Sequence, residues 1–240
     1  MIITFCSGKG GVAKSTSALA TCGLLARRYR VAIVDLDPDA YATTMGLGHP
    51  PSPDPLTSAP VRIIHPLLNR GELWLYRGGD TMDDASEAAV AAHVARCAAV
   101  ADIVVVDTPP DRRRSTVITA LRAASVVVIP VISEFQSLAG MEKLMDSCRT
   151  LGLTAPVRAL MSRWEAKTLL AQDVHRDLVT AHPGTAISVA IPKDQRAAEA
   201  PAAGLPVTLY APRSPASLAY RTAIYEIAAT GGIRIPQEAL

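Results

Sequence analysis

The sequence predicts an α/β fold with a mostly parallel, twisted sheet flanked by helices on both faces. Short apolar, β-branched runs recur along the chain, separated by Ala- and Leu-rich stretches with helical spacing. The first such unit, residues 2–34, is a strand, a helix and a second strand, which is typical of a right-handed βαβ unit. The continuous apolar run Ile103 to Val106 is typical of a parallel strand buried on both faces.

Composition limits the function classes. The chain has 240 residues, 49% of them hydrophobic, so we expect a sizeable core and a single domain over residues 1–240. Only 4% of the residues are aromatic, which argues against a base-stacking surface, and a net charge of +2 does not by itself indicate a nucleic-acid binder. The four cysteines form no C-x-x-C pair, which favours core thiols in a reducing cytoplasm. No apolar run is long enough for a transmembrane helix, and the N-terminus indicates a strand rather than a signal peptide.

The remaining elements follow from the pattern of apolar residues. Expected strands are residues 2–6, 31–34, 61–64, 72–76, 103–106, 125–131, 157–161 and 186–191. Expected helices are residues 17–28, a helix capped by Asp83 or Asp84 and ending near Ala98, and residues 134–149, 167–180 and 217–229. The Pro-rich residues 49–60 are expected to be a surface loop, residues 231–240 an irregular tail, and His93 a helix-surface residue.

A Gly-rich segment, residues 7–16, lies between the first strand and the first helix. Glycines let backbone N–H groups approach a phosphate closely, and the helix N-terminus adds partial positive charge. Gly8 and the Lys14-Ser15 pair fit the P-loop pattern G-x-x-x-x-G-K-[ST], in which the lysine contacts the β/γ-phosphates and the hydroxyl contacts Mg²⁺. Ala13 stands where the pattern has its second glycine, and a methyl group is tolerable there if φ is negative.

The same segment also fits the dinucleotide fingerprint G-x-G-x-x-A, as Gly8, Gly10 and Ala13, with Asp35 as a ribose partner. That interpretation leaves Lys9, Lys14 and the two hydroxyl residues that follow without a role. Two lysines in one loop suit a triphosphate better than a pyrophosphate, so the sequence favours a P-loop nucleoside triphosphatase.

Acidic residues close two of the expected strands. Asp35 and Asp37 follow residues 31–34, and Asp107 follows residues 103–106. Because parallel strands end at one edge, these carboxylates are expected beside the phosphate loop, where open α/β sheets bind ligands. The run after Asp107, residues 111–114, is either a solvated loop or a switch segment whose arginines face a partner subunit or DNA.

Residues 9–16, Lys-Gly-Gly-Val-Ala-Lys-Ser-Thr, resemble the deviant Walker A motif KGGxxK[ST] of the ParA/MinD ATPases. Residues 35–38, 107–110 and 191–204 are also similar to that family, most of all to its ParA (Soj-like) partition ATPases. The resemblance implies that ATP is held by Gly8, Lys9, Gly10, Gly11, Val12, Ala13, Lys14, Ser15, Thr16, Asp35, Asp107 and Pro192. It implies that Mg²⁺ is held by Ser15, Asp35 and Asp107. It further implies that Lys9 reaches the partner's nucleotide, that Lys14 binds the phosphates and that Asp37 orients the attacking water.

The implied function is an ATP-dependent dimerising switch that hydrolyses ATP to ADP and phosphate, weakly unless stimulated by a partner. Such a protein binds DNA without sequence preference, drives plasmid or chromosome partition with a ParB-like DNA-bound activator, and is cytoplasmic and nucleoid-associated. Expected DNA contacts are Lys193, Arg196, Arg213 and Arg221, with scattered solvated arginines as the alternative. Two other functions remain: positioning a protein cargo on the nucleoid, and MinD-like regulation of the division site at the membrane. The membrane branch is disfavoured because residues 231–240 offer no amphipathic helix.

Overall fold

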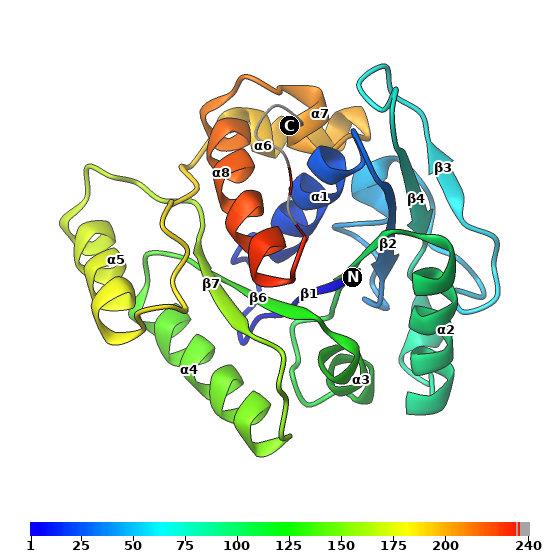
Figure 1. Ribbon diagram of the computed structural model, residues 1–240, viewed down its shortest axis with the longest axis horizontal. Helices are drawn as coiled ribbons and strands as arrows, with labels where there is room; N and C mark the ends of the chain where they lie inside the picture. Colours follow the sequence, from blue (N-terminus) through cyan, green and yellow to red (C-terminus); the bar gives the residue numbers. More distant parts are fainter. Residues whose placement is uncertain (234, 236–240) are drawn as a thin grey trace.

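A computed structural model describes residues 1–233 and 235. Its seven strands form one sheet in the order β3-β4-β2-β5-β1-β6-β7 (Figure 1). The strands are β1 (Ile2–Phe5), β2 (Arg30–Asp35), β3 (Val61–Ile63), β4 (Glu72–Tyr76), β5 (Ile103–Asp107), β6 (Val126–Val131) and β7 (Val157–Met161). All neighbouring pairs are parallel except the antiparallel pair β3 and β4. The predicted α/β fold with a mostly parallel sheet is therefore confirmed.

Helices cover both faces of this sheet (Figure 1). The α-helices are α1 (Lys14–Leu25), α2 (Glu87–Val100), α3 (Ser115–Ala123), α4 (Phe135–Thr150), α5 (Leu169–Ala181), α6 (Gln195–Glu199), α7 (Val207–Tyr210) and α8 (Pro215–Thr230). Short 3₁₀ helices span Met45–Leu47, Asp80–Met82 and Ala200–Ala203. Helices α1, α7 and α8 lie on one face, and α2, α3 and α4 lie on the other.

The alternation of side chains along each strand explains this arrangement. In β5, Val105 packs in the cluster that contains α1 and α8, whereas Val104 and Val106 pack in the cluster that contains α2. All five residues of β5 are buried. Since successive side chains point to opposite faces, only a strand that is apolar throughout can serve two helical layers.

Several expected elements differ in the structure. Residues 186–191 contain one isolated bridge, at Ala186, rather than a strand. The Ile187 N–H donates to Ala159, but the next N–H to reach β7 is that of Ile191, which donates to Met161, so residues 188–190 lie outside the ladder. Helix α2 is capped by Ser86, whose hydroxyl accepts from the Ala89 N–H at 3.2 Å, and not by Asp83 or Asp84. Helix α3 was not expected, because the arginine run before it resembles a loop.

His93 is 3% exposed, so its expected place on the helix surface is wrong. Its Nδ1 lies 3.2 Å from the carbonyl oxygen of Leu56, which also accepts from Arg96 Nη2 at 2.7 Å. Leu56 belongs to the Pro-rich residues 49–60, which contain no helix or strand. His93 and Arg96 therefore fasten this segment against α2.

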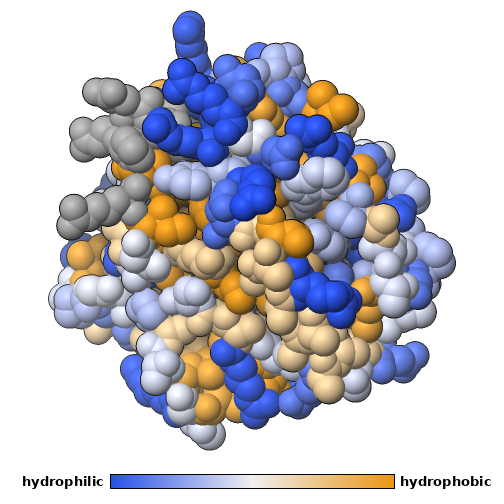
Figure 2. Space-filling view, turned by 45° about the vertical axis from the view of Figure 1, so that its right-hand side comes forward, coloured by the Kyte–Doolittle hydropathy of each residue, from blue (hydrophilic) through white to orange (hydrophobic). Residues whose placement is uncertain are grey.

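Figure 2 shows apolar side chains through the centre of one face, bordered by hydrophilic residues at its top and lower edge. Among the described residues, no helix combines the length and apolarity that crossing a bilayer requires. The tail expected at residues 231–240 lies outside the described residues, apart from 231–233 and 235.

Candidate functional site

The candidate site lies at the carboxyl ends of β1, β2 and β5. In the sheet register, Asp107 at the end of β5 pairs with Phe5 on one side and with Asp35 on the other. The phosphate loop, residues 7–13, leaves β1 at the same edge and leads into α1. The sheet thus brings together the loop and both strand-ending carboxylates, as the sequence predicted.

The loop enters α1 through a left-handed residue. Ala13 has φ +64° and ψ +30°, and its carbonyl oxygen accepts from the Ser17 N–H at 2.9 Å, so it is the N-cap of the helix. The negative φ under which a methyl group would be tolerable at Ala13 is therefore not met. A left-handed conformation costs a non-glycine residue about 1–2 kcal/mol, which explains why glycine suits this position better.

Lys14 and Asp107 form a buried ion pair. Lys14 Nζ lies 2.5 Å from Asp107 Oδ1, and Thr43 Oγ1 donates to Asp107 Oδ2 at 2.6 Å. Burial alone would lower the pKa of Lys14, but the adjacent Asp107 carboxylate raises it above the ordinary value. Ser15 Oγ lies 3.4 Å from the same ammonium group. Lys14 is thus charged, and Asp107 fixes its ammonium group beside the first turn of α1.

Asp35 is the second buried carboxylate of the site. Its Oδ2 accepts from Thr44 Oγ1 at 2.6 Å and from the Thr44 N–H at 3.0 Å, and its Oδ1 accepts from the Asp37 N–H. Burial, and then the charge of Asp107, raises the pKa of Asp35 to about 7. Burial likewise raises the pKa of the partly buried Asp37. Thr43 and Thr44 were not predicted as site residues, and their place shortly after the Asp35–Asp37 run is the only signal of them in the sequence.

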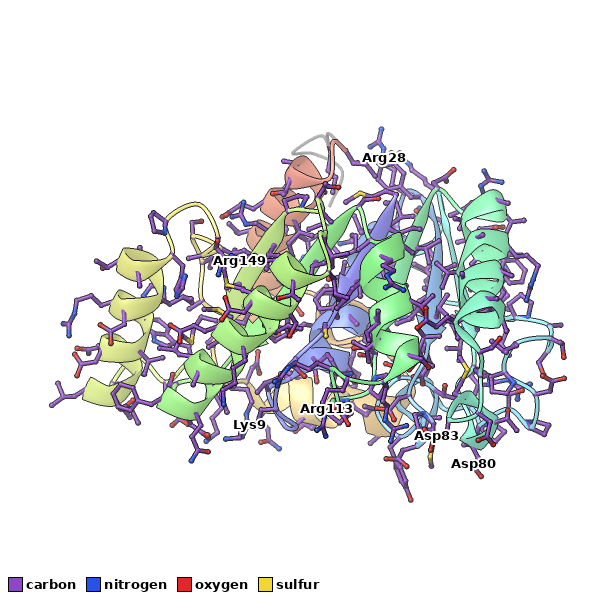
Figure 3. The ribbon with its side chains drawn as sticks, turned by 90° about the horizontal axis from the view of Figure 1, so that it is seen from below. Lys9, Arg28, Asp80, Asp83, Arg113 and Arg149 are labelled. Atoms are coloured by element: carbon purple, nitrogen blue, oxygen red, sulfur yellow. The ribbon has the colours of Figure 1, made fainter. Side chains whose placement is uncertain are left out.

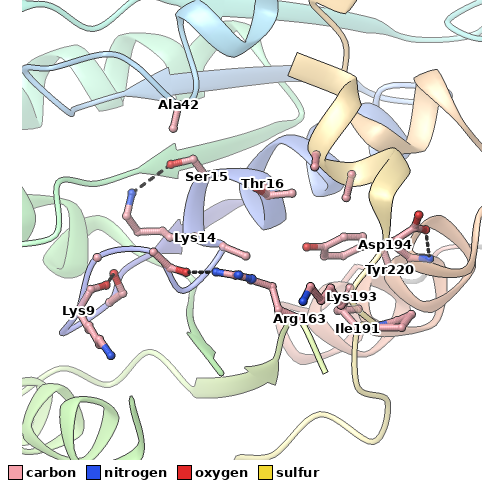
Figure 4. A pocket seen from close by; sticks show the side chains of 18 of the residues that line it. Lys9, Lys14, Ser15, Thr16, Ala42, Arg163, Ile191, Lys193, Asp194 and Tyr220 are labelled. Atoms are coloured by element: carbon pink, nitrogen blue, oxygen red, sulfur yellow. Dashed lines mark hydrogen bonds between the residues drawn. The ribbon is translucent and has the colours of Figure 1, made fainter. Parts of the chain in front are cut away.

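A cleft of about 520 Å³ opens beside the loop (Figure 4). One wall is the loop and the start of α1, and the other is residues 191–195 together with α6 and Tyr220 of α8. The predicted residues that line this cleft are Lys9, Gly10, Gly11, Ala13, Lys14, Ser15, Thr16, Asp37, Pro192 and Lys193. Gly8, Val12, Asp35 and Asp107 do not line it, although Asp107 bonds to Lys14. Burial raises the pKa of Tyr220 to about 12, and its hydroxyl lies 3.0 Å from Ser17 Oγ.

A second hollow, of about 460 Å³, adjoins the outer side of the loop and is lined by Lys9, Pro110, Arg112 and Arg113 among others. Figure 3 shows Lys9 and Arg113 at the same end of the molecule, opposite Arg28. Lys9 forms an ion pair with Glu134, the residue before α4. Asp111 also lines the hollow and pairs with Arg113, so three cationic side chains and one carboxylate lie there next to the phosphate loop.

The four basic residues expected to contact DNA do not line one common hollow. Lys193 lies in the cleft and pairs with Glu165 at 3.0 Å. Arg196, which pairs with Glu199 at 2.9 Å, lines a shallow hollow with Arg213. Arg221 is exposed on α8. Arg196 and Arg213 thus share a hollow that Lys193 and Arg221 do not line.

The donor set suits Mg²⁺ bound together with phosphates. Ser15, Asp35 and Asp107 offer hard oxygen donors, and the two carboxylates are register partners at the ends of β2 and β5. Within residues 1–233 and 235, no cluster of three or more His, Cys, Asp or Glu could hold a metal by itself. Mg²⁺ in proteins commonly uses one or two carboxylates plus substrate phosphates, so the residues present fit that mode.

Comparison with known proteins identifies the family. Residues 3–207 match the CobQ/CobB/MinD/ParA nucleotide binding domain. The chain is 35% identical to the chromosome-partitioning ATPase Soj of Thermus thermophilus over 244 residues, which covers 95% of each chain.

Two solved structures share the fold. A putative plasmid partition protein of Borrelia burgdorferi, bound to AMPPNP, has a TM-score of 0.77 at 19% identity and covers 95% of this chain and 98% of its own. The septum site-determining protein MinD of Pyrococcus horikoshii, complexed with Mg-ADP, has a TM-score of 0.77 at 19% identity and covers 98% of both chains. This chain belongs to the CobQ/CobB/MinD/ParA nucleotide-binding domain family.

Proposed function

We propose that this chain is an ATP-dependent dimerising switch ATPase of the ParA type, which binds DNA non-specifically and drives plasmid or chromosome partition. The observation that carries the proposal is the pair of lysines in one loop, since Lys14 faces inward to Asp107 while Lys9 faces outward to Glu134. The similarity to a partitioning ATPase over nearly the whole chain supports it.

The phosphates of ATP would lie in the cleft against Lys14 and the backbone N–H groups of residues 10–16. When bound, Mg²⁺ held by Ser15 and, through water, by Asp35 and Asp107 would neutralise the charge that develops on the phosphate oxygens. Asp37 lines the cleft beside Lys14 and would orient the attacking water. Its raised pKa makes its carboxylate a better proton acceptor than an ordinary aspartate.

Lys9 would complete the site of the partner subunit. It lies on the rim shared by the cleft and the outer hollow, and its side chain is 35% exposed. An ammonium group on this rim can reach a phosphate that approaches from outside the protomer. ATP binding and dimerisation would then be one linked equilibrium, which hydrolysis reverses by removing the γ-phosphate contacts.

The DNA-binding step would use Arg196, Arg213 and Arg221, with Lys193 nearest the nucleotide. Arg196 of α6 and Arg213, two residues before α8, line the same hollow, so both could contact one stretch of phosphate backbone. A ParB-like protein bound to DNA would stimulate hydrolysis.

The test combines sedimentation and DNA binding. With Mg-ATP, an Asp37→Ala variant should hydrolyse slowly and sediment as a dimer, whereas Lys14→Ala should remain a monomer. The ATP dimer should retard DNA of any sequence, with log K falling linearly with log salt. A sedimentation coefficient unchanged by ATP, or no retardation at low salt, would contradict the proposal.

A further inference from the structure

Arg163 has a strained backbone next to the nucleotide cleft. Its φ is +51°, one of three positive values among the non-glycine residues of the described chain. A long side chain adopts this left-handed conformation only when the surrounding structure imposes it, and such residues cluster at functional sites.

The residues on either side of Arg163 are both fixed. The Ser162 N–H donates to the carbonyl oxygen of Val131 in β6 at 2.7 Å, and the Trp164 N–H donates to that of Ile191 at 2.8 Å. The chain therefore pairs with β6 up to Ser162 and with the cleft wall at Ile191 from Trp164 onward. Arg163 is the single residue that makes the turn between them.

The side chain of Arg163 crosses to the opposite wall. Its Nη1 donates to the carbonyl oxygen of Gly11 at 3.1 Å. Figure 4 shows Arg163 between the phosphate loop and the wall that carries Ile191 and Lys193, and Arg163 itself lines the cleft. Gly11 has φ +76°, and nothing would lie within 4 Å of a Cβ built there, so its own packing does little to fix its orientation.

We propose that Arg163 is a positioning residue that presets the phosphate loop, acting through the Gly11 carbonyl group. The inference rests on the proposed nucleotide-binding function and adds a residue to it. Because the peptide unit is planar and trans, fixing the Gly11 carbonyl also fixes the direction of the Val12 N–H. A loop held in advance loses less conformational freedom when a phosphate chain binds.

This role for Arg163 predicts which ligands should lose affinity when Arg163 is replaced. If Arg163 acts through the loop, its loss weakens every ligand that carries the phosphate chain by a similar factor. If instead it contacted the base or sugar, inorganic tripolyphosphate would bind the variant as well as it binds the original protein.

The experiment measures binding of Mg-ATP and Mg-tripolyphosphate to the full chain and to Arg163→Gly, Arg163→Ala and Arg163→Lys, with Arg149→Ala as the control on the outside of α4. We expect Arg163→Gly to lower the affinity for both ligands about tenfold, which corresponds to the loss of one charge-assisted hydrogen bond. Arg163→Lys should recover part of this loss. KM for ATP should rise more than kcat falls, because the loop is held equally before and during reaction.

A second readout separates the side chain from the backbone. Arg163→Gly should melt about 2 °C above Arg163→Ala, because glycine accepts the positive φ without strain while both lack the guanidinium group. Unchanged affinity in Arg163→Gly, a loss confined to ATP, or equal melting of these two variants would each overturn the inference. If the original protein bound neither ligand, the proposed function itself would fail.

Discussion

Lys14 and Asp107 pair directly at the carboxyl edge of the sheet, with Nζ and Oδ1 2.5 Å apart and side chains 8% and 1% exposed. Each of these charges is costly to bury alone, so each stabilises the other. The Lys14 ammonium group and the Asp107 carboxylate are therefore each other's partner when no ligand is bound. Under the proposed function, a triphosphate would compete with Asp107 for the Lys14 ammonium group, and an Asp107 carboxylate released in this way would be available to support Mg²⁺.

Replacing Lys14 by alanine should destabilise the fold as well as abolish nucleotide binding. The substitution leaves Asp107 buried beside Asp35 with no cation, and breaking a buried pair in this way costs about 3–5 kcal/mol. Urea unfolding measures the loss.

The double variant Lys14→Ala with Asp107→Ala should be more stable than Lys14→Ala alone, because it removes the orphaned charge. Lys193→Ala, which breaks the exposed pair with Glu165, serves as the control and should cost less than about 1 kcal/mol. Equal free energies of unfolding for Lys14→Ala and Lys193→Ala would show that the buried pair stabilises the fold no more than the exposed pair does.

Ala13→Gly should stabilise the protein. Glycine relieves the left-handed strain at φ +64° but adds chain entropy to the unfolded state, so the net gain should be about 1 kcal/mol. In a thermal melt this corresponds to a rise of roughly 2–4 °C for a chain of this size.

The matched control is Ala92→Gly, at an exposed position inside α2, which should lower stability by about 1 kcal/mol. If both glycine substitutions destabilised equally, the backbone at Ala13 would not be strained.

The sequence predicted the sheet and the phosphate-binding edge because both depend on local patterns. A continuous apolar run such as Ile103–Val106 needs two helical layers, and an aspartate directly after it must lie at the strand end. The position of Asp107 beside the loop follows from parallel pairing alone.

The features that the sequence did not predict depend on contacts between distant segments. Arg163 bonds to Gly11, which is 152 positions away, and the buried state of His93 depends on a carbonyl group in the Pro-rich segment. The sign of φ at Ala13 is set by the way the loop joins α1, and an alanine gives no local indication of it. These features therefore required the tertiary structure.

His93 should make stability pH-dependent. Burial, and then the nearby Arg96 cation, lowers the pKa of His93 below its ordinary value. Below about pH 6.5 the unfolded chain binds a proton at this imidazole that the folded chain resists, so the contribution of His93 to the free energy of unfolding should fall as the pH drops through that range. This contribution is opposite in sign to that of Asp35, whose pKa is raised on folding.

Urea titrations at several pH values between 5 and 7.5 measure this slope. His93→Gln, which keeps a donor for the Leu56 carbonyl without titrating, should lose this contribution, so its free energy of unfolding should rise relative to that of the original protein as the pH drops. Arg96→Ala should also reduce this contribution, by removing one cause of the lowered pKa. An identical slope in the original protein and His93→Gln would assign the pH dependence to other groups.

The ion pair between Lys9 and Glu134 should compete with dimerisation. If Lys9 serves the nucleotide of the partner subunit, it must leave Glu134 first, and Glu134→Gln removes that competitor. Since an exposed pair contributes at most about 1 kcal/mol, the unfolding free energy should change little, while the ATP-dependent dimer should tighten by up to about fivefold. Sedimentation velocity over a range of protein concentrations with Mg-ATP measures both the dimer and its dissociation constant. Glu142→Gln, on the same helix, is the control and should leave the dimer unchanged, whereas a weaker dimer in Glu134→Gln would place Glu134 in the interface instead.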